Sequence, residues 1–183
     1  MTQPTTKWPN VPACYGWLTL TRRGEWRLGD GKVSHGGLLD FINRHYAPAE
    51  DGAWCVHNGP QKVYAALEYT PWVWRLTDGA LLAHTGADAG IPGAAWLDEA
   101  GSLLLSTGLG IGLLDDRDLP ALLSRLADGG GSPLADDALD ALCAGRCPEN
   151  GLSLRWGMAL LPLEFITRAD VPARFGFDPA PQA

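Results

Sequence analysis

The sequence predicts an α+β protein with mostly antiparallel sheets and three short helices. In one interpretation, these elements form two similar β-rich subdomains. Short alternating apolar and polar segments are joined by turns of about two to five residues, and such turns join antiparallel neighbours. Three other segments show helical spacing of apolar residues. The 183 residues are 46% hydrophobic and 19% charged, which predicts a folded chain with a buried core.

Three hairpins are predicted where alternating segments flank turns that contain glycine. Their tips are Arg22-Arg23-Gly24, Asn58-Gly59-Pro60-Gln61 and Glu99-Ala100-Gly101. The strands are expected over residues 17–20, 25–28, 54–57, 62–69, 72–76, 80–84, 95–98, 102–106, 111–114, 152–156 and 158–166.

The three helices are expected over residues 35–46, 118–127 and 135–143. Ser34 and Asp118 are predicted to cap the first two, because their side-chain oxygens can accept a bond from an unpaired backbone N–H. The second helix has an apolar stripe that must pack on a sheet or on another helix. The stripe consists of Leu119, Leu122, Leu123 and Leu126. A last short helix is expected over residues 170–175.

The chain is predicted to divide into an N-terminal subdomain over 8–84 and a C-terminal subdomain over 94–177, with loose tails at 1–7 and 178–183. A weak internal repeat supports this division, because each part reads as a hairpin, a third strand, a cap and a helix. The two parts share few residue identities, so coincidental turn chemistry is the alternative.

The charge and composition of the chain limit the kinds of partner that it can bind. The net charge of −7 and the isoelectric point of about 4.9 disfavour nucleic acid as a partner, because a phosphate backbone would be repelled. No signal-peptide pattern and no apolar run of about 18 residues is visible, so we expect a cytoplasmic protein with no membrane partner. Its four cysteines are then expected as free thiols. An unknown small molecule or protein remains as partner, and the oligomeric state stays open.

The hairpin around residues 58–61 suggests a possible ligand-binding face. Polar and aromatic side chains gather along its strands and their continuation, which could form a pocket. The candidates are His57, Gln61, Tyr64, Glu68, Trp72 and Trp74. The alternative is an ordinary sheet with one buried and one wet face.

Three other motifs are better explained by structure than by chemistry. Cys143 and Cys147 lack the spacing of common zinc ligands, and nothing in the sequence places Cys55 and His57 beside them. The glycines at 108, 110 and 112 are not followed directly by the helix that a dinucleotide site requires. The aspartates at 115, 116 and 118 lack the glutamate of an EF-hand. We therefore expect no metal, no cofactor and no identifiable catalytic residue.

Eight tryptophans are a large number for a chain of this length. Tryptophan fills small cores but also forms binding faces. Trp17, Trp26 and Trp96 are predicted to lie in the core, whereas Trp72 and Trp74 are left open between core and binding face.

Several segments together resemble a known family. They are 8–12 (WPNVP), 14–18 (CYGWL), 24–27 (GEWR), 41–46 (FINRHY), 58–64 (NGPQKVY) and 169–177 (ADVPARFGF). Over about residues 8–177 the chain resembles a proteobacterial family of uncharacterised proteins known only as a domain of unknown function. Part of it is similar to a second uncharacterised family with two small β-rich subdomains. The resemblance implies an α+β fold and no particular reaction.

Two functional hypotheses follow. The first is a non-enzymatic module that binds a ligand or a protein, or has a regulatory role, because no catalytic constellation is visible. The second is a small hydrolase-like enzyme that uses His57 and a carboxylate on the sheet face of residues 53–76 as acid and base.

Overall fold

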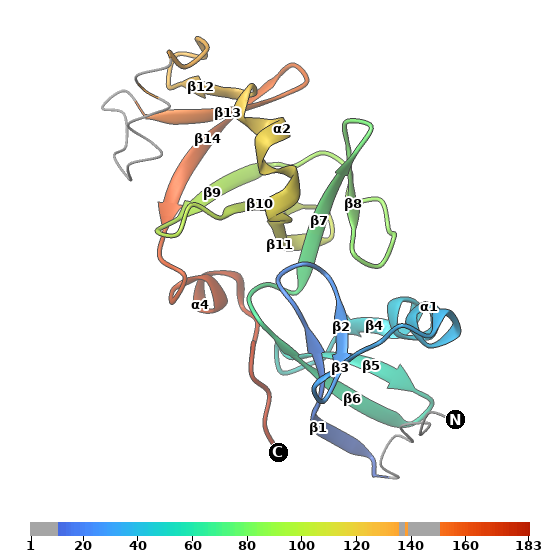
Figure 1. Ribbon diagram of the computed structural model, residues 1–183. Helices are drawn as coiled ribbons and strands as arrows, with labels where there is room; N and C mark the ends of the chain where they lie inside the picture. Colours follow the sequence, from blue (N-terminus) through green and yellow to red (C-terminus); the bar gives the residue numbers. More distant parts are fainter. Residues whose placement is uncertain (1–10, 136–137, 139–150) are drawn as a thin grey trace.

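The computed structural model describes residues 11–135, 138 and 151–183, and the chain forms two mixed sheets with short helices (Figure 1). The first sheet has the strand order β3-β2-β1-β6-β5-β4. Its strands are β1 (Ala13–Leu20), β2 (Trp26–Leu28), β3 (Gly31–Lys32), β4 (Tyr46–Pro48), β5 (Trp54–Asn58) and β6 (Gln61–Leu67).

The second sheet has the order β12-β13-β14-β9-β10-β11-β7-β8. Its strands are β7 (Trp72–Thr77), β8 (Ala80–Ala83), β9 (Ala94–Asp98), β10 (Leu103–Thr107), β11 (Gly110–Leu114), β12 (Leu126–Asp128), β13 (Leu152–Trp156) and β14 (Ala159–Ile166). The strands β7 and β8, which lie inside the N-terminal subdomain predicted over 8–84, therefore hydrogen-bond in the second sheet. The chain passes from one sheet to the other at residues 68–71.

The predicted excess of antiparallel pairing is present, but both sheets are mixed. Among the described residues, nine of the twelve strand pairs are antiparallel, and the parallel pairs are β1 with β6, β7 with β11 and β9 with β14. Each parallel pair joins strands that are far apart in the sequence, so the intervening elements supply the long connection that parallel pairing requires. Turn signals report only neighbouring strands and could not predict these pairs.

The helices are shorter than expected. The first, α1 (Gly36–His45), is capped by the ring of His35, whose Nδ1 accepts from the amide of Leu38 at 3.3 Å, so the predicted cap at Ser34 is wrong by one residue. A 3₁₀ turn (Asp116–Asp118) leads into α2 (Leu119–Leu123). Leu126 belongs to β12, which corrects the helix predicted over 118–127.

The C-terminal helix α4 (Val171–Phe175) agrees with the short helix expected over 170–175. The helix predicted over 135–143 falls almost wholly outside the described residues. None of the helices in the described part of the chain is long and apolar enough to cross a membrane.

The two sheets contain two copies of one topology. The first unit comprises β1 to β6 with α1, and the second comprises β9 to β14 with α2. In both units, three antiparallel strands are followed by a helix and three further strands, and the last strand pairs in parallel with the first. The pairing directions of the other strands also agree. The weak repeat in the sequence therefore corresponds to a duplicated architecture.

Strand register aligns the two units residue by residue. Leu20 pairs with Trp26 in the first unit as Leu97 pairs with Leu103 in the second, so Leu103 stands where the first unit has Trp26. The pairs Tyr46 with Val56 and Leu126 with Leu154 correspond in the same way, so Leu126 stands in the position of Tyr46.

One type of turn recurs twice in each unit. In the turn of residues 21–25, Gly24 has φ of 72° and its amide donates to the carbonyl of Thr21, while the amide of Thr21 donates to Glu25. Residues 98–102 repeat this pattern around Gly101. The turns 49–53 and 128–132 also repeat it, as does 83–87 outside the two units. Glycine is favoured at the fourth position because a positive φ strains other residues.

One hydrophobic core includes residues of both sheets. Trp26, Trp74 and Trp96 are buried in it, and Trp72 is only 8% exposed. Trp17 is 41% exposed, so its predicted place in the core is wrong. The alternation of β1 explains this, because Leu18 and Leu20 are buried and Trp17 therefore faces the opposite side of the sheet.

The C-terminal segment returns to the first sheet after α4 (Figure 1). The amide of Asp178 donates to the carbonyl of Gly52, and the amide of Leu67 donates to the carbonyl of Pro179. Phe177 is buried in the core. The start of the tail predicted over 178–183 is therefore hydrogen-bonded to the first unit.

Candidate ligand-binding cavity

The six residues proposed as a ligand-binding face do not gather at one place. Trp72 and Trp74 lie in the second sheet, and their indole N–H groups donate to the backbone carbonyls of Leu109 and Leu105. The other four candidates lie on β5, on β6 or just after it. Trp72 lines a cavity of about 360 Å³ with residues from both sheets and from the end of α4, but none of the other five candidates does so.

The residues of the first sheet have local structural partners. Tyr64 stacks on Tyr15 with ring centroids 4.4 Å apart, and burial raises its pKa to about 12. The amide side chain of Gln61 donates to the carbonyl of Val11 and accepts from Asn58. The carboxylate of Glu68 accepts from the backbone amide of Arg22.

His57 lies beside a thiol. Its Nε2 is 3.6 Å from the Sγ of Cys55, and no hydrogen bond joins it to a carboxylate within the described part of the chain. Burial raises the pKa of Cys55, so this thiol stays protonated at neutral pH.

The aspartates at 115, 116 and 118 are hydrogen-bonded to arginines. Asp115 is fully buried and accepts from the backbone and side chain of Arg117, while Asp118 accepts from Arg75. Desolvation acts to raise the pKa of Asp115, but the hydrogen bonds and charge of Arg117 outweigh it and lower the pKa. In the described residues, no group of three or more His, Cys, Asp or Glu side chains is placed to hold a metal ion. Cys143 and Cys147 lie outside the described residues.

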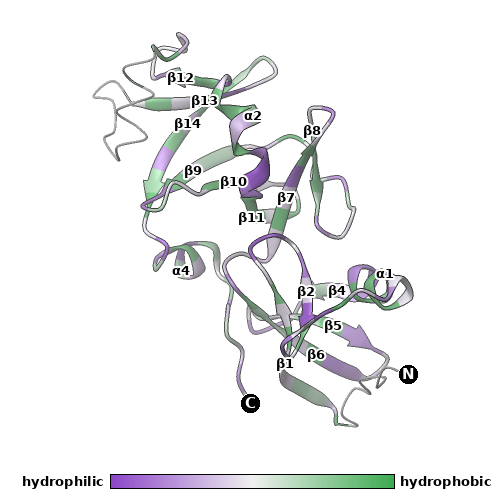
Figure 2. Cartoon of the chain, viewed as in Figure 1, coloured by the Kyte–Doolittle hydropathy of each residue, from purple (hydrophilic) through white to green (hydrophobic). Residues whose placement is uncertain are grey.

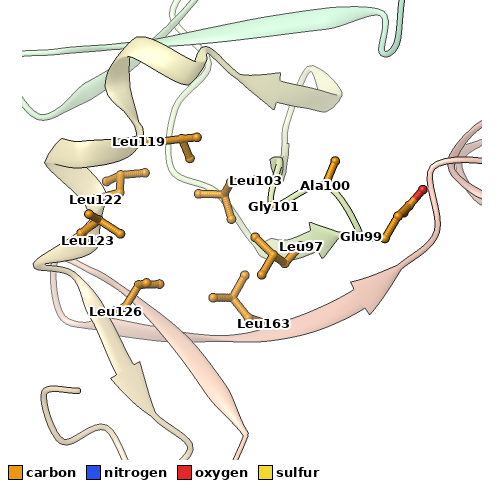
Figure 3. Close-up of a pocket in the computed structure, with 10 residues that line it drawn as sticks. All are labelled: Leu97, Glu99, Ala100, Gly101, Leu103, Leu119, Leu122, Leu123, Leu126 and Leu163. Atoms are coloured by element: carbon orange, nitrogen blue, oxygen red, sulfur yellow. The ribbon is translucent and has the colours of Figure 1, made fainter. Parts of the chain in front are cut away.

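A half-open cavity of about 340 Å³ lies in the second unit between α2 and the strands β9, β10 and β14. Seven leucines make up most of its wall, and Figure 3 shows those of α2 and β12 facing those of the three strands. The lining residues are Leu97, Glu99, Ala100, Gly101, Leu103, Leu119, Leu122, Leu123, Leu126 and Leu163. Leu123 at the rim is 48% exposed.

The duplicated topology explains why this space is hollow. In the first unit the equivalent positions hold Trp26 and Tyr46, whose rings meet edge to face at 5.0 Å. The ring of His84 packs against both at 5.4 and 5.6 Å. In the second unit, Leu103 and Leu126 replace the two aromatic residues. Because leucine is smaller than either, the same framework leaves a cavity where the first unit has a filled core.

A second cavity of about 320 Å³ adjoins the leucine cavity and shares Ala100, Gly101 and Leu119 with it. Arg22 and Arg23 line it from the hairpin tip of the first unit, and Ser102 lines it from the equivalent tip of the second. Figure 2 shows that the segment 115–118, immediately before α2, is hydrophilic, in contrast to the leucines that follow. Two adjoining cavities therefore lie here, one lined mainly by leucines and the other, the basic cavity, lined by Arg22, Arg23 and Asp116 among others.

Arg22 is held in place by Ser102 of the second unit and by Tyr69 of the crossover segment 68–71. Its Nη2 donates to the hydroxyl of Ser102 at 2.8 Å, and its guanidinium lies 4.7 Å from the ring centroid of Tyr69. The phenol of Tyr69 donates to Asp98, and its pKa is raised by desolvation and by this hydrogen bond. Arg168 lies against the ring of Tyr69 as well, at 5.0 Å.

Sequence reasoning found part of this site without identifying it. The leucine stripe of the second helix supplies four of the lining residues. The strands that complete the cavity lie before and after that helix in the sequence, and their meeting depends on the parallel pairing of β9 with β14. The replacement of Trp26 by the smaller Leu103 in the second unit would have indicated a space in its core.

Two solved structures of DUF1285 family proteins are similar to this chain. The one from Silicibacter pomeroyi DSS-3 is 14% identical with a TM-score of 0.53, and the match covers 83% of this chain and 81% of that chain. The one from Shewanella baltica OS155 is 13% identical with a TM-score of 0.43, and covers 57% and 88%. At such identity, the first similarity shows a shared fold alone.

No curated protein matches the chain. The predicted partial similarity to a second uncharacterised family agrees with the DUF1285 structures. The family DUF2944, described as protein of unknown function (DUF2946), matches residues 1–182, so the predicted resemblance to an uncharacterised family is confirmed and the chain belongs to DUF2944.

Proposed function

We propose that this protein is a non-enzymatic binding module that holds a small apolar molecule in the leucine cavity of the second unit. The observation that carries the proposal is the half-open space of about 340 Å³ with seven leucines in its wall. Its size falls within the range of ligand sites, which are largely apolar with few polar groups. The exposed rim at Leu123 gives a ligand access from solvent.

The contrast between the two units supports a binding role. The same framework is filled by aromatic rings in one unit and left hollow in the other. Cavities in cores are destabilising, because lost contacts and lost burial are not recovered. A ligand that fills the space would restore those contacts, since apolar burial contributes about 25 cal/mol per Å².

The alternative of a small hydrolase that uses His57 and a carboxylate remains a hypothesis. His57 lines neither the leucine cavity nor the adjoining basic cavity. Its contact with Cys55 offers no proton acceptor of the required kind.

The test uses N-phenyl-1-naphthylamine, a neutral apolar fluorophore that brightens when it leaves water. The natural protein should bind it saturably. The double variant Leu103→Trp with Leu126→Tyr introduces large aromatic side chains at the two positions where the first unit has Trp26 and Tyr46. Binding should weaken at least tenfold, because these side chains fill the cavity.

Two further variants make the outcome decisive. Leu123→Asp places a charge at the exposed rim without changing a fully buried position, and should also weaken binding of the fluorophore. Leu160→Trp adds a similar ring on β14 outside the cavity and should leave binding unchanged, with circular dichroism confirming the fold of each variant. Equal binding by all four proteins would contradict the proposed site.

A further inference from the structure

We propose that the ligand is an aliphatic carboxylate whose chain fills the leucine cavity and whose anionic head group is bound by Arg22. This inference rests on the proposed function and names the chemistry of its ligand. Three features of Arg22 and of the basic cavity carry it.

The first feature is an unused hydrogen-bond donor. The Nη1 of Arg22 is buried and has no hydrogen-bond partner in the structure. Buried donors are nearly always satisfied, because leaving one unpaired costs free energy. Arg22 lines the basic cavity, so a ligand acceptor in that cavity lies next to the guanidinium that carries this unpaired donor.

The second feature is a guanidinium group without a side-chain ion pair among the described residues. Within the described residues, Arg22 forms no side-chain ion pair, and its guanidinium contacts a hydroxyl and an aromatic face. Three other arginines differ, because Arg23 pairs with Asp116, Arg75 with Asp118 and Arg117 with Asp115. An anion is therefore the ligand group that complements Arg22 in both hydrogen bonding and charge.

The carboxylates near the cavities already accept hydrogen bonds from groups of the protein. Asp116 accepts from Arg23, and Glu99 accepts from the backbone amide of Arg168. Glu68 accepts from the backbone amide of Arg22 and so helps to fix the hairpin tip. The stacking on Tyr69 and the bond to Ser102 hold the guanidinium in position, so little ordering is required when an anion binds.

The third feature is the closeness of the two cavities. They share Ala100, Gly101 and Leu119, so the proposed ligand would pass from Arg22 over these three residues to the leucines. A methylene group is similar in size to a water molecule, which occupies about 30 Å³ in the liquid. A cavity of about 340 Å³ therefore has room for an aliphatic chain of about ten carbons.

The experiment compares three displacing compounds that share a ten-carbon chain. Decanoate, 1-decanol and decylamine are titrated at neutral pH against the natural protein with bound N-phenyl-1-naphthylamine. Decanoate should displace the fluorophore at a concentration about ten to a hundred times lower than 1-decanol, as expected for a hydrogen bond to a charged group. Decylamine should be weaker than the alcohol.

Variants assign the preference to one residue. Arg22→Gln removes the charge and should make decanoate and 1-decanol equivalent. Arg44→Gln, at an exposed position on α1 that lines neither cavity, should retain the preference. A preference lost in Arg44→Gln but kept in Arg22→Gln would overturn the assignment.

The outcomes separate this inference from the proposed function. Equal displacement by decanoate and 1-decanol in the natural protein would overturn the anionic ligand while leaving the apolar binding site intact. This comparison does not depend on the folding of any variant. Failure of the fluorophore to bind, or of every ten-carbon compound to displace it, would overturn both.

Discussion

At the scale of single residues, His84 links acidity to stability. Burial among Trp26, Tyr46 and Trp72 lowers its pKa to about 3 from the ordinary value of 6.5. As the pH falls below 6.5, the unfolded chain binds a proton that the folded chain does not. The free energy of unfolding should therefore decrease by up to about 1.4 kcal/mol per pH unit, or about 2 kcal/mol at pH 5.

Urea denaturation of the natural protein and of His84→Asn between pH 8 and pH 5 tests this linkage. The variant should be less stable at pH 8, because ring contacts are lost, but the difference should shrink as the pH falls. Carboxylates such as Asp115 titrate in both proteins and cancel in the comparison. A difference independent of pH would contradict the buried neutral state of His84.

Predictions for single residues from the sequence were correct at some positions and wrong at others. Trp26 and Trp96 are in the core as expected, whereas Trp17 is not. The alternation of β1 could have excluded Trp17, since burial of Leu18 and Leu20 on one face leaves it on the other. The cap at His35 was missed because serine is the commoner capping residue.

At the scale of elements, the recurring glycine turn provides a matched pair of positions. Gly24 and Gly101 both have positive φ, but a Cβ at Gly24 would lie 2.6 Å from the Cβ of His84, whereas one at Gly101 meets nothing within 4 Å. Gly101→Ala should cost about 1 to 2 kcal/mol from backbone strain alone. Gly24→Ala should cost more, because the core around His84 must also shift.

Urea denaturation midpoints of the two single variants measure this difference at pH 8. The order of stability should be natural protein, Gly101→Ala and then Gly24→Ala. Equal losses would mean that the close approach to His84 does not limit the first turn.

The sequence predicted the hairpins and the first helix because these depend on residues a few positions apart. The parallel pairs could not be predicted in this way, since β1 and β6 meet only when α1 and the strands around it are in place. The same limit applies to the cavity. Leu119 and Leu122 were identified as an apolar stripe, but Leu163 reaches them through a pairing that no local pattern reports.

At the scale of the whole molecule, the last residues of the chain stabilise the first unit. Phe177 is buried, and residues 178 and 179 hydrogen-bond to Gly52 and Leu67. Removal of residues 177–183 should cost about 3 to 5 kcal/mol, the sum of one buried aromatic side chain and two hydrogen bonds. Removal of residues 181–183 should cost much less.

Hydrogen exchange of the Leu67 amide gives the most direct measurement, because its acceptor is the carbonyl of Pro179. This amide should exchange faster in the longer truncation and remain protected in the shorter one. Unchanged protection in both would show that the C-terminal contacts do not stabilise the first sheet.

The return of the C-terminal segment has a consequence for how the protein is synthesised. A ribosome delivers the strands of the first unit early, but residues 177–179 are synthesised only after all the strands of the second unit. The amide of Leu67 and the carbonyl of Gly52 must therefore wait for their partners until the second unit has been synthesised. The duplicated units therefore cannot mature one after the other during synthesis, and the first is completed last.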